Sequence, residues 1–179
     1  MKNNLSVREI KESDIPLIID YWYDADDEFL VRLGVDVNKI PSRTSWHNML
    51  LQQISQPYSK KKSYCIIWEV DSNPAGHSNV NKIIFGKEAY MHLHLWHADS
   101  RQKGNGTEFV KKTLPFFFNN LELKNLYCEP YALNPPPNKT LQKLGFDFVN
   151  EHVTIPGFLN FEQKVNLWQL TLEKFKKVV

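Results

Sequence analysis

Apolar residues near the start of the chain follow first a strand pattern and then a helix pattern. Residues 5–10 alternate between apolar and polar side chains, which is typical of a half-buried strand. The next apolar residues recur at intervals of three and four, and a proline falls in the first turn, where a missing backbone N–H loses no bond. These helical positions are Ile15, Ile18, Ile19 and Trp22.

The segment from residue 24 to residue 45 has no periodic pattern, and we expect it to be irregular. Gly34 and Pro41 interrupt it, and both residues disfavour a continuous helix or strand. It opens with an acidic cluster made of Asp24, Asp26, Asp27 and Glu28. A second helix is predicted over residues 46–54, with Met49 and Leu50 facing inward.

Three apolar runs then follow one another with short links, over residues 64–70, 75–84 and 89–97. Short links predict an antiparallel meander, so the sheet is not wholly parallel. The period of two in the third run separates its side chains into two faces. One face carries Tyr90, His92, His94 and Trp96, and the other carries Met91, Leu93, Leu95 and His97.

After a glycine-bearing loop, apolar spacing predicts a helix over about residues 105–119, which contains Pro115. Proline inside a helix removes a backbone hydrogen bond and clashes with the preceding turn, at about 3 kcal/mol if unrelieved. We therefore expect a kink at Thr113–Leu114 or a helix that restarts at Pro115. Because this helix joins the third run to the next strand, residues 123–129, the two strands should run parallel.

The last part of the chain predicts a short helix and a closing pair of strands. Residues that precede prolines are pushed away from helical backbone angles, so the helix after Asn134 should begin no earlier than Pro137. Gly145 stands where a left-handed C-terminal cap belongs. The closing strands are predicted over residues 148–154 and 165–171.

Composition indicates an ordinary soluble globular protein. The chain has 179 residues, 42% hydrophobic and 23% charged, and its net charge of +2 is too small to indicate nucleic acid or an anionic membrane as a partner. No run approaches the roughly 18 apolar residues of a membrane span, and no signal peptide opens the chain, so a cytoplasmic location is expected. Cys65 and Cys128 lie in apolar runs, which favours buried thiols over a disulfide.

The loop before the central helix carries the main chemical signal. Gly104 and Gly106 directly precede a helix, where backbone N–H groups and the helix dipole favour a phosphate or pyrophosphate. Lys103 adds positive charge. An ordinary tight turn is the alternative. The dinucleotide fingerprint needs a third glycine where Phe109 stands, which disfavours a Rossmann fold.

Two motifs resemble the GNAT superfamily of N-acetyltransferases. Arg101, Gly104 and Gly106 match the fixed positions of its Arg/Gln-x-x-Gly-x-Gly/Ala pyrophosphate loop. Asn134, eleven residues before the Gly145-Phe146 pair, matches its later motif, although the family usually has Ser or Ala at the position of Pro137. The resemblance extends over almost all of the chain and is weakest over residues 24–62.

This resemblance implies an α/β (α+β) fold, one domain over residues 1–179. The sheet would be mixed and mostly antiparallel, flanked by helices, with a central parallel strand pair that splays apart. Acetyl-CoA, the implied cosubstrate, would lie in the gap, and no metal is implied. The implied cofactor-binding residues are Leu95, Trp96, His97, Arg101, Gln102, Lys103, Gly104, Asn105, Gly106, Thr107, Asn134, Lys139 and Lys143.

Amine acetylation needs a base, directly or through water, because a lysine-like ammonium has a pKa of about 10.4, and an acid for the departing thiolate. Siderophore-type lysine acyltransferases of the family carry a histidine nine residues before the loop arginine, which corresponds to His92 here. They also carry Glu-Pro-Asp after the following strand, where this chain has Glu129, Pro130 and Tyr131. His92 and, second, His94 are the candidate bases, and Tyr131 is a candidate acid or a wall of the substrate pocket.

Several alternatives remain open at this point. The histidines could be core residues, or a metal site with His77 and His97, but His97 points away and no zinc-like spacing occurs. The acidic cluster could steer an amine or form a solvated loop. The favoured function is an acetyl-CoA-dependent N-acetyltransferase that acts by direct attack of a primary amine of a small molecule or peptide.

The alternative function is a non-catalytic acyl-CoA-binding or interaction domain on the same fold. Aminoglycoside acetyltransferases and RimJ/RimL-type protein acetyltransferases share parts of the later motif, so the acceptor is not determined. We expect a monomer or homodimer without nucleic-acid or membrane partners.

Overall fold

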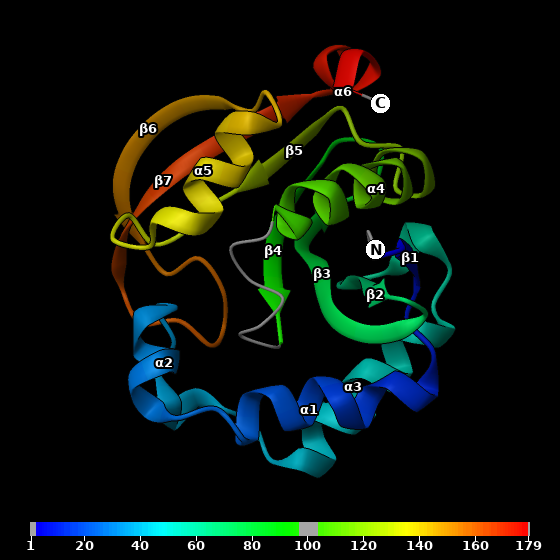
Figure 1. Ribbon diagram of the computed structural model, residues 1–179, viewed down its shortest axis with the longest axis vertical. Coiled ribbons are helices and arrows are strands. Elements are labelled where there is room, and N and C mark those ends of the chain that lie inside the picture. The colour runs from blue at the N-terminus through cyan, green and yellow to red at the C-terminus, as the bar shows by residue number, and fades with distance from the viewer. Residues whose placement is uncertain (1–2, 97–103, 179) are drawn as a thin grey trace.

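A computed structural model describes residues 3–96 and 104–178 as one sheet with helices on both faces (Figure 1). The strands are β1 (Leu5–Glu9), β2 (Tyr64–Val70), β3 (Asn73–Ile84), β4 (Glu88–Leu95), β5 (Asn125–Cys128), β6 (Asp147–Thr154) and β7 (Gln163–Thr171). The α-helices are α1 (Ile15–Tyr23), α2 (Asp27–Arg32), α3 (Arg43–Ser55), α4 (Asn105–Asn120), α5 (Pro135–Lys143) and α6 (Leu172–Val178). Short 3₁₀ turns are η1 (Glu12–Asp14), η2 (Val37–Lys39) and η3 (Tyr58–Lys60).

The strand order is β1-β2-β3-β4-β5-β7-β6, and every neighbouring pair is antiparallel except β4 and β5. This parallel pairing ends where Met91 lies opposite Cys128, whereas β4 continues to Leu95. The central parallel pair therefore splays apart. The predicted α/β (α+β) class, with a mixed and mostly antiparallel sheet flanked by helices, is confirmed.

Alternate strand positions enter two separate cores, as the period of two requires. On one face, α4, α5 and α6 pack against side chains that include Trp68, Met91 and Leu126. On the other face, α1, α2 and α3 pack against Cys65 and Ile67 of β2. Figure 1 shows α1 and α3 on one side of the sheet and α4 on the other. Both cysteines are buried free thiols, as predicted.

The first helix follows the prediction closely, because its four predicted apolar positions are all buried in the second core. The prediction for residues 24–45 is wrong, since this segment contains α2 and η2. The Asp26 side chain accepts a hydrogen bond from the Phe29 N–H and so caps α2, while Leu30 is buried. Met49 was also predicted wrongly: Trp46 and Leu50 are the buried side chains of α3.

The predicted restart at Pro115 is wrong, because α4 runs unbroken from Asn105 to Asn120. Buried side chains on both sides of the proline, including Phe109 and Phe117, stabilise the continuous helix. The kink at Thr113–Leu114 stays a prediction.

The prediction that α5 begins no earlier than Pro137 is also wrong. The helix begins at Pro135, and Asn134 before it keeps extended backbone angles. N–H groups in the first turn have no intrahelical partner, so three consecutive prolines lose no bond there. The end of this helix was predicted correctly, since Gly145 has a left-handed backbone with φ of 79°.

No helix in residues 3–96 or 104–178 is long and apolar enough to cross a lipid bilayer.

Candidate active site

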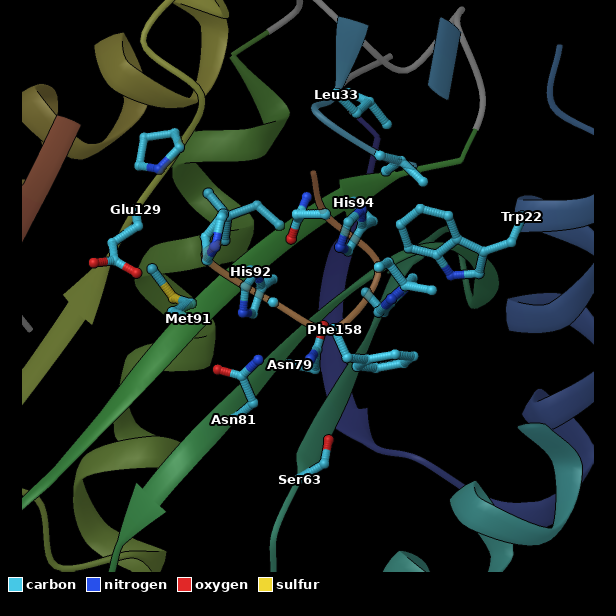
Figure 2. Close-up of a pocket in the computed structure, with 18 of the residues that line it drawn as sticks. Trp22, Leu33, Ser63, Asn79, Asn81, Met91, His92, His94, Glu129 and Phe158 are labelled. Atoms are coloured by element: carbon cyan, nitrogen blue, oxygen red, sulfur yellow. The ribbon is translucent and has the colours of Figure 1, made fainter. Parts of the chain in front are cut away.

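A cavity of about 160 Å³ opens where β4 leaves β5 (Figure 2). Its walls come from β3 and β4, from α1 and α3, from the turn after β5, and from the loop between β6 and β7. That loop is tied to the segment after α2. The Asp36 N–H donates to the Leu159 carbonyl at 2.8 Å, and Asn160 Nδ2 donates to the Gly34 carbonyl at 2.9 Å. Segments far apart in the chain therefore enclose one pocket.

A ladder of polar side chains on β3 and β4 forms the floor of this pocket. The strand register places His77 opposite His94 and Asn79 opposite His92. Asn81 lies on the same face two residues further along β3, opposite Tyr90. The side chains of these three β3 residues, of His92 and of His94 line the pocket. The opposite face of the same strands carries Val80 and Met91 and enters the main core.

His94 lies in an aromatic enclosure. Its ring stacks on His77 with centroids 4.7 Å apart, and it meets the edge of Trp22 at 4.9 Å. Trp96 Nε1 donates to His77 Nδ1 at 2.8 Å. Burial lowers the pKa of His77 to about 3 and holds the pKa of His94 well below its usual value, so both rings are neutral at pH 7. His94 packs among rings, and its Nδ1 is enclosed without a partner in the described part of the chain.

His92 offers a reactive nitrogen. Its Nε2 is enclosed and has no hydrogen-bond partner within the described part of the chain. Burial, with a smaller contribution from Lys82, lowers the pKa of His92 to about 4. The imidazole is therefore neutral at physiological pH and keeps a lone pair available for a proton. A methyl group at Gly157 would lie 3.5 Å from His92 Cε1, so this glycine covers the ring.

Tyr131 and Asn134 approach the pocket from the turn after β5. Tyr131 forms an isolated bridge with Val165 of β7, which anchors the turn to the sheet. Asn138 Nδ2 donates to the carbonyl of Asn134 at 2.9 Å, and Asn138 Oδ1 accepts from Trp168 Nε1 at 2.9 Å. The Asn134 side chain makes no capping bond to α5. Asn134 is among the residues that line the pocket.

Glu129 is the one carboxylate among the described residues that line the pocket. Its side chain is 7% exposed and lies between two basic groups, with Lys82 Nζ at 3.4 Å and His152 Nε2 at 3.3 Å. The predicted acidic cluster does not line the pocket. Its residues serve local structure instead, as when Glu28 pairs with Arg32 and Asp24 lies 3.8 Å from Arg43.

The N-terminus of α4 lies next to the end of β4. Gly104 has a left-handed backbone with φ of 77°, which suits glycine at this N-cap. A methyl group at Gly106 would lie 3.8 Å from Leu95 Cδ1 and 4.0 Å from Thr140 Oγ1 of α5. The first N–H groups of a helix are available to an anion. Lys139 and Lys143 are exposed on α5.

The structure thus separates the predicted residues into two groups. His92, His94, Tyr131 and Asn134 meet in the pocket, whereas Leu95, Gly104, Asn105, Gly106 and Thr107 gather around the start of α4. Trp96 follows β4 directly. The predicted residues His97, Arg101, Gln102 and Lys103 lie outside the described residues.

Asn79, Asn81 and Gln163 also line the pocket, although no motif predicted them. The Oδ1 atom of Asn81 and the Oε1 atom of Gln163 are enclosed and have no partner within the described residues. Alternation along β3 would have placed His77, Asn79 and Asn81 on one face, but their proximity to His92 depends on the register between two strands.

Comparison with known proteins agrees with this architecture. Residues 4–147 match the family model described as an acetyltransferase (GNAT) domain. The chain therefore belongs to the GNAT family of acetyltransferases. Membership supports N-acetyltransferase activity with an acyl-CoA donor in general terms. No curated protein matches the chain.

Solved structures of three acetyltransferases share the fold. The ribosomal α-N-protein acetyltransferase RimL in complex with coenzyme A is 14% identical, with a TM-score of 0.76 and 95% of each chain covered. A spermidine N-acetyltransferase from Vibrio cholerae in complex with CoA and spermine is 16% identical, with a TM-score of 0.77, covering 96% of this chain and 98% of that chain. The aminoglycoside acetyltransferase AAC(6')-Ib in complex with coenzyme A is 14% identical, with a TM-score of 0.73, covering 97% and 98%.

Proposed function

We propose that this chain is a single-domain, acetyl-CoA-dependent N-acetyltransferase that acetylates a primary amine by direct attack of the amine on the thioester. The observation that carries the proposal is the enclosed and unpartnered Nε2 of His92 at the fork between β4 and β5. An enclosed acceptor without a donor is unfavourable in the free protein. It is the arrangement expected of a base that meets its partner only when a substrate binds.

The fork and the start of α4 suit a coenzyme A thioester. Parallel pairing stops at Met91, and the following part of β4 leads to the glycines at the start of α4. The N–H groups at Gly104, Asn105, Gly106 and Thr107 would receive the pyrophosphate, together with Arg101, Gln102 and Lys103. Leu95, Trp96 and His97 would supply backbone contacts, and Asn134 a side-chain contact. Lys139 or Lys143 would meet the 3′-phosphate.

His92 acts as the base in the proposed mechanism. Its neutral ring accepts a proton from the acceptor nitrogen as that nitrogen bonds to the acetyl carbon. The low pKa of His92 suits this timing, because the nitrogen becomes a much stronger acid once its lone pair is used in the new bond. The proton then leaves His92 for solvent.

Tyr131 acts as the acid. The carbon–sulfur bond breaks as the new carbon–nitrogen bond is completed, and the Tyr131 hydroxyl gives its proton to the departing sulfur. A proton from solvent, matching the one that His92 releases, restores the hydroxyl. The neutral amine and acetyl-CoA thus give the acetamide and the free thiol, with no net release of a proton. A backbone N–H at His97 is the proposed donor to the negative oxygen.

Thiol release from acetyl-CoA, measured across a panel of primary amines, tests the proposal. We expect amine-dependent thiol release with stoichiometric acetamide by mass spectrometry. Acetyl-CoA binding is measured separately by calorimetry. Binding of acetyl-CoA without turnover on any amine of a broad panel would favour the non-catalytic acyl-CoA-binding domain instead.

A further inference from the structure

Two side chains in the pocket each carry an enclosed polar atom without a partner in the described part of the chain. His92 Nε2 and Asn81 Oδ1 are both enclosed, and neither has a hydrogen-bond partner within the described residues. Asn81 lies opposite Tyr90, two residues before His92, so the side chains of Asn81 and His92 are diagonal neighbours on one face of the sheet. Figure 2 shows these two side chains next to each other, with Glu129 on one side and Phe158 on the other.

A single glycine lies against both side chains. A methyl group at Gly157 would lie 3.5 Å from His92 Cε1 and 3.7 Å from Asn81 Nδ2. It would also lie only 2.9 Å from Asn160 Oδ1, so the loop leaves no room for a side chain at this position. The glycine therefore brings the loop between β6 and β7 against the His92 ring and the Asn81 amide.

Two neutral acceptors in one pocket, the Asn81 carbonyl and the His92 nitrogen that carries no proton, favour a donor with at least two N–H groups. An enclosed acceptor without a donor is unfavourable in the free protein, and a ligand that donates to both offsets this cost. A carboxylate or phosphate has only acceptors to offer at neutral pH and is disfavoured there. A primary amine or ammonium has two or three N–H groups on one nitrogen and meets both requirements.

The remaining walls are aromatic and uncharged. The Trp22 and Trp46 rings stack with centroids 5.7 Å apart, and Trp46 meets the edge of Phe158 at 6.5 Å. Phe158 is 57% exposed, so much of its surface remains available for contact. A cavity of about 160 Å³ is close to the roughly 150 Å³ that accommodates a benzene molecule. One ring, or a chain of a few carbons, matches this space.

A second positive charge on the acceptor would find no free carboxylate among the described residues that line the pocket. Glu129, the one carboxylate among the described lining residues, already lies between Lys82 and His152. A second ammonium group of a polyamine would have to displace one of these partners or stay without a counter-charge.

We infer that the acceptor is a primary amine attached to an uncharged, apolar or aromatic group, and that Asn81 binds its nitrogen. One N–H donates to Asn81 Oδ1 while another donates to His92 Nε2, and the apolar group rests against Trp46 and Phe158. Asn81 thereby directs the nitrogen lone pair away from the strand and towards the thioester. This inference rests on the proposed acetyltransferase function and specifies its acceptor.

The first arm of the test compares 2-phenylethylamine and n-hexylamine with spermidine, using thiol release at one pH. We expect kcat/KM for either apolar amine to exceed that for spermidine by about tenfold or more. Preference for spermidine would overturn the inference while leaving the acetyltransferase proposal intact.

The second arm removes the acceptor atom through Asn81→Leu. Loss of a hydrogen bond to an amine should raise KM for 2-phenylethylamine by about ten- to a hundredfold, while the dissociation constant for acetyl-CoA stays unchanged. Asn81→Asp retains the acceptor and should keep or lower that KM. Asn73→Leu is the matched control, because Asn73 lies exposed at the far end of the same strand and should change neither value.

The possible results distinguish failure of the proposed role of Asn81 from failure of the proposed acetyltransferase activity. An unchanged amine KM in Asn81→Leu, or a raised KM in Asn81→Asp, contradicts the role of Asn81 alone. Acetyl-CoA binding without turnover on any amine removes the acetyltransferase proposal and this inference together. Melting temperatures report whether each variant folds, and the amine panel with the unaltered protein decides the acceptor class even if Asn81→Leu does not fold.

Discussion

Two polar clusters lie against the same sheet but differ in whether their hydrogen bonds are completed. In the Glu9 cluster (Glu9, Tyr58, Tyr64 and Asn120), the Tyr58 hydroxyl donates to Glu9 Oε1 at 2.6 Å and Tyr64 donates to the same oxygen. Asn120 Nδ2 donates to the Tyr64 hydroxyl at 2.8 Å. In the pocket cluster (Asn81, His92 and His94), each residue has an enclosed atom without a partner in the described chain.

This difference separates a structural cluster from a binding cluster. The Glu9 cluster joins β1, β2 and the C-terminal end of α4, so its bonds stabilise the contact between these elements. The pocket cluster leaves acceptors unsatisfied at a cost to folding, which a ligand offsets. Removing a group from the first cluster should lower stability, and removing one from the second should lower activity.

The largest expected effect follows from His92→Gln, which keeps a polar side chain and removes the titratable nitrogen. Loss of a general base should lower kcat by about 10²- to 10⁴-fold, with little change in melting temperature. Steady-state kinetics and thermal unfolding measure the two quantities. His47→Gln, on α3 and outside the pocket lining, is the control and should leave kcat unchanged. A fall in melting temperature without a fall in kcat would place His92 with the structural residues.

Tyr131→Phe should produce the next largest effect. Loss of the acid should lower kcat by about 10²-fold, the lower end of the range for proton transfer. The loss of kcat should be smaller with acyl donors whose thiol is a better leaving group, and turnover with such donors measures this. Tyr23→Phe removes an exposed hydroxyl that donates to the Pro41 carbonyl, and it serves as the control. Equal kcat in both variants would make Tyr131 a wall of the pocket.

Tyr64→Phe tests the structural cluster. The Tyr64 side chain is 3% exposed, and its loss leaves Asn120 and Glu9 with one partner fewer in a buried place. The free energy of unfolding should fall by about 1–3 kcal/mol, measured by urea denaturation, while kcat/KM is unchanged. Tyr58→Phe, at a more exposed hydroxyl of the same cluster, should cost less. A loss of activity at undiminished stability would remove the distinction between the clusters.

The smallest effect is expected from the titration of His77. Its pKa of about 3 in the folded state lies below the value of 6.5 for a free histidine, so the unfolded chain binds the proton first. The contribution of neutral His77 to the free energy of unfolding is fully present above pH 6.5. It is lost progressively as the pH falls from 6.5 towards 3. Between pH 7 and pH 5 the expected loss is about 2 kcal/mol.

Urea denaturation at the two pH values measures this loss. In His77→Gln, the fall in the free energy of unfolding between pH 7 and pH 5 should be smaller by about 2 kcal/mol. His152→Gln is the control at a more exposed histidine. An equal pH dependence in His77→Gln and the unaltered protein would mean that His77 is not held neutral by burial.

Prediction from sequence succeeded where neighbouring residues decide the structure. The apolar stripe of α1, the alternation along β4 and the left-handed backbone of Gly145 depend on spacing and on the conformational preference of single residues. The pocket-facing positions of His92 and His94 followed from that alternation. The motif resemblance indicated Tyr131 and Asn134, and both line the pocket.

Prediction failed where distant segments decide the outcome. The helix α2 forms beside a loop more than a hundred residues later in the chain, to which Asp36 and Gly34 are hydrogen-bonded. Packing of Phe109 and Phe117 keeps α4 continuous across Pro115. Gln163 carried no local signal, and alternation along β3 could give the face of Asn81 but not its proximity to His92.

The sequence by itself determined the order of the strands, the two faces of β4 and the family to which the chain belongs, because these depend on periodicity and on short motifs. Only the tertiary structure decided which polar atoms find partners. Satisfaction of a buried acceptor depends on strand register and on loops brought from elsewhere in the chain. That is why Glu9 lies in a completed network while Asn81 and His92 face a pocket with bonds still to be made.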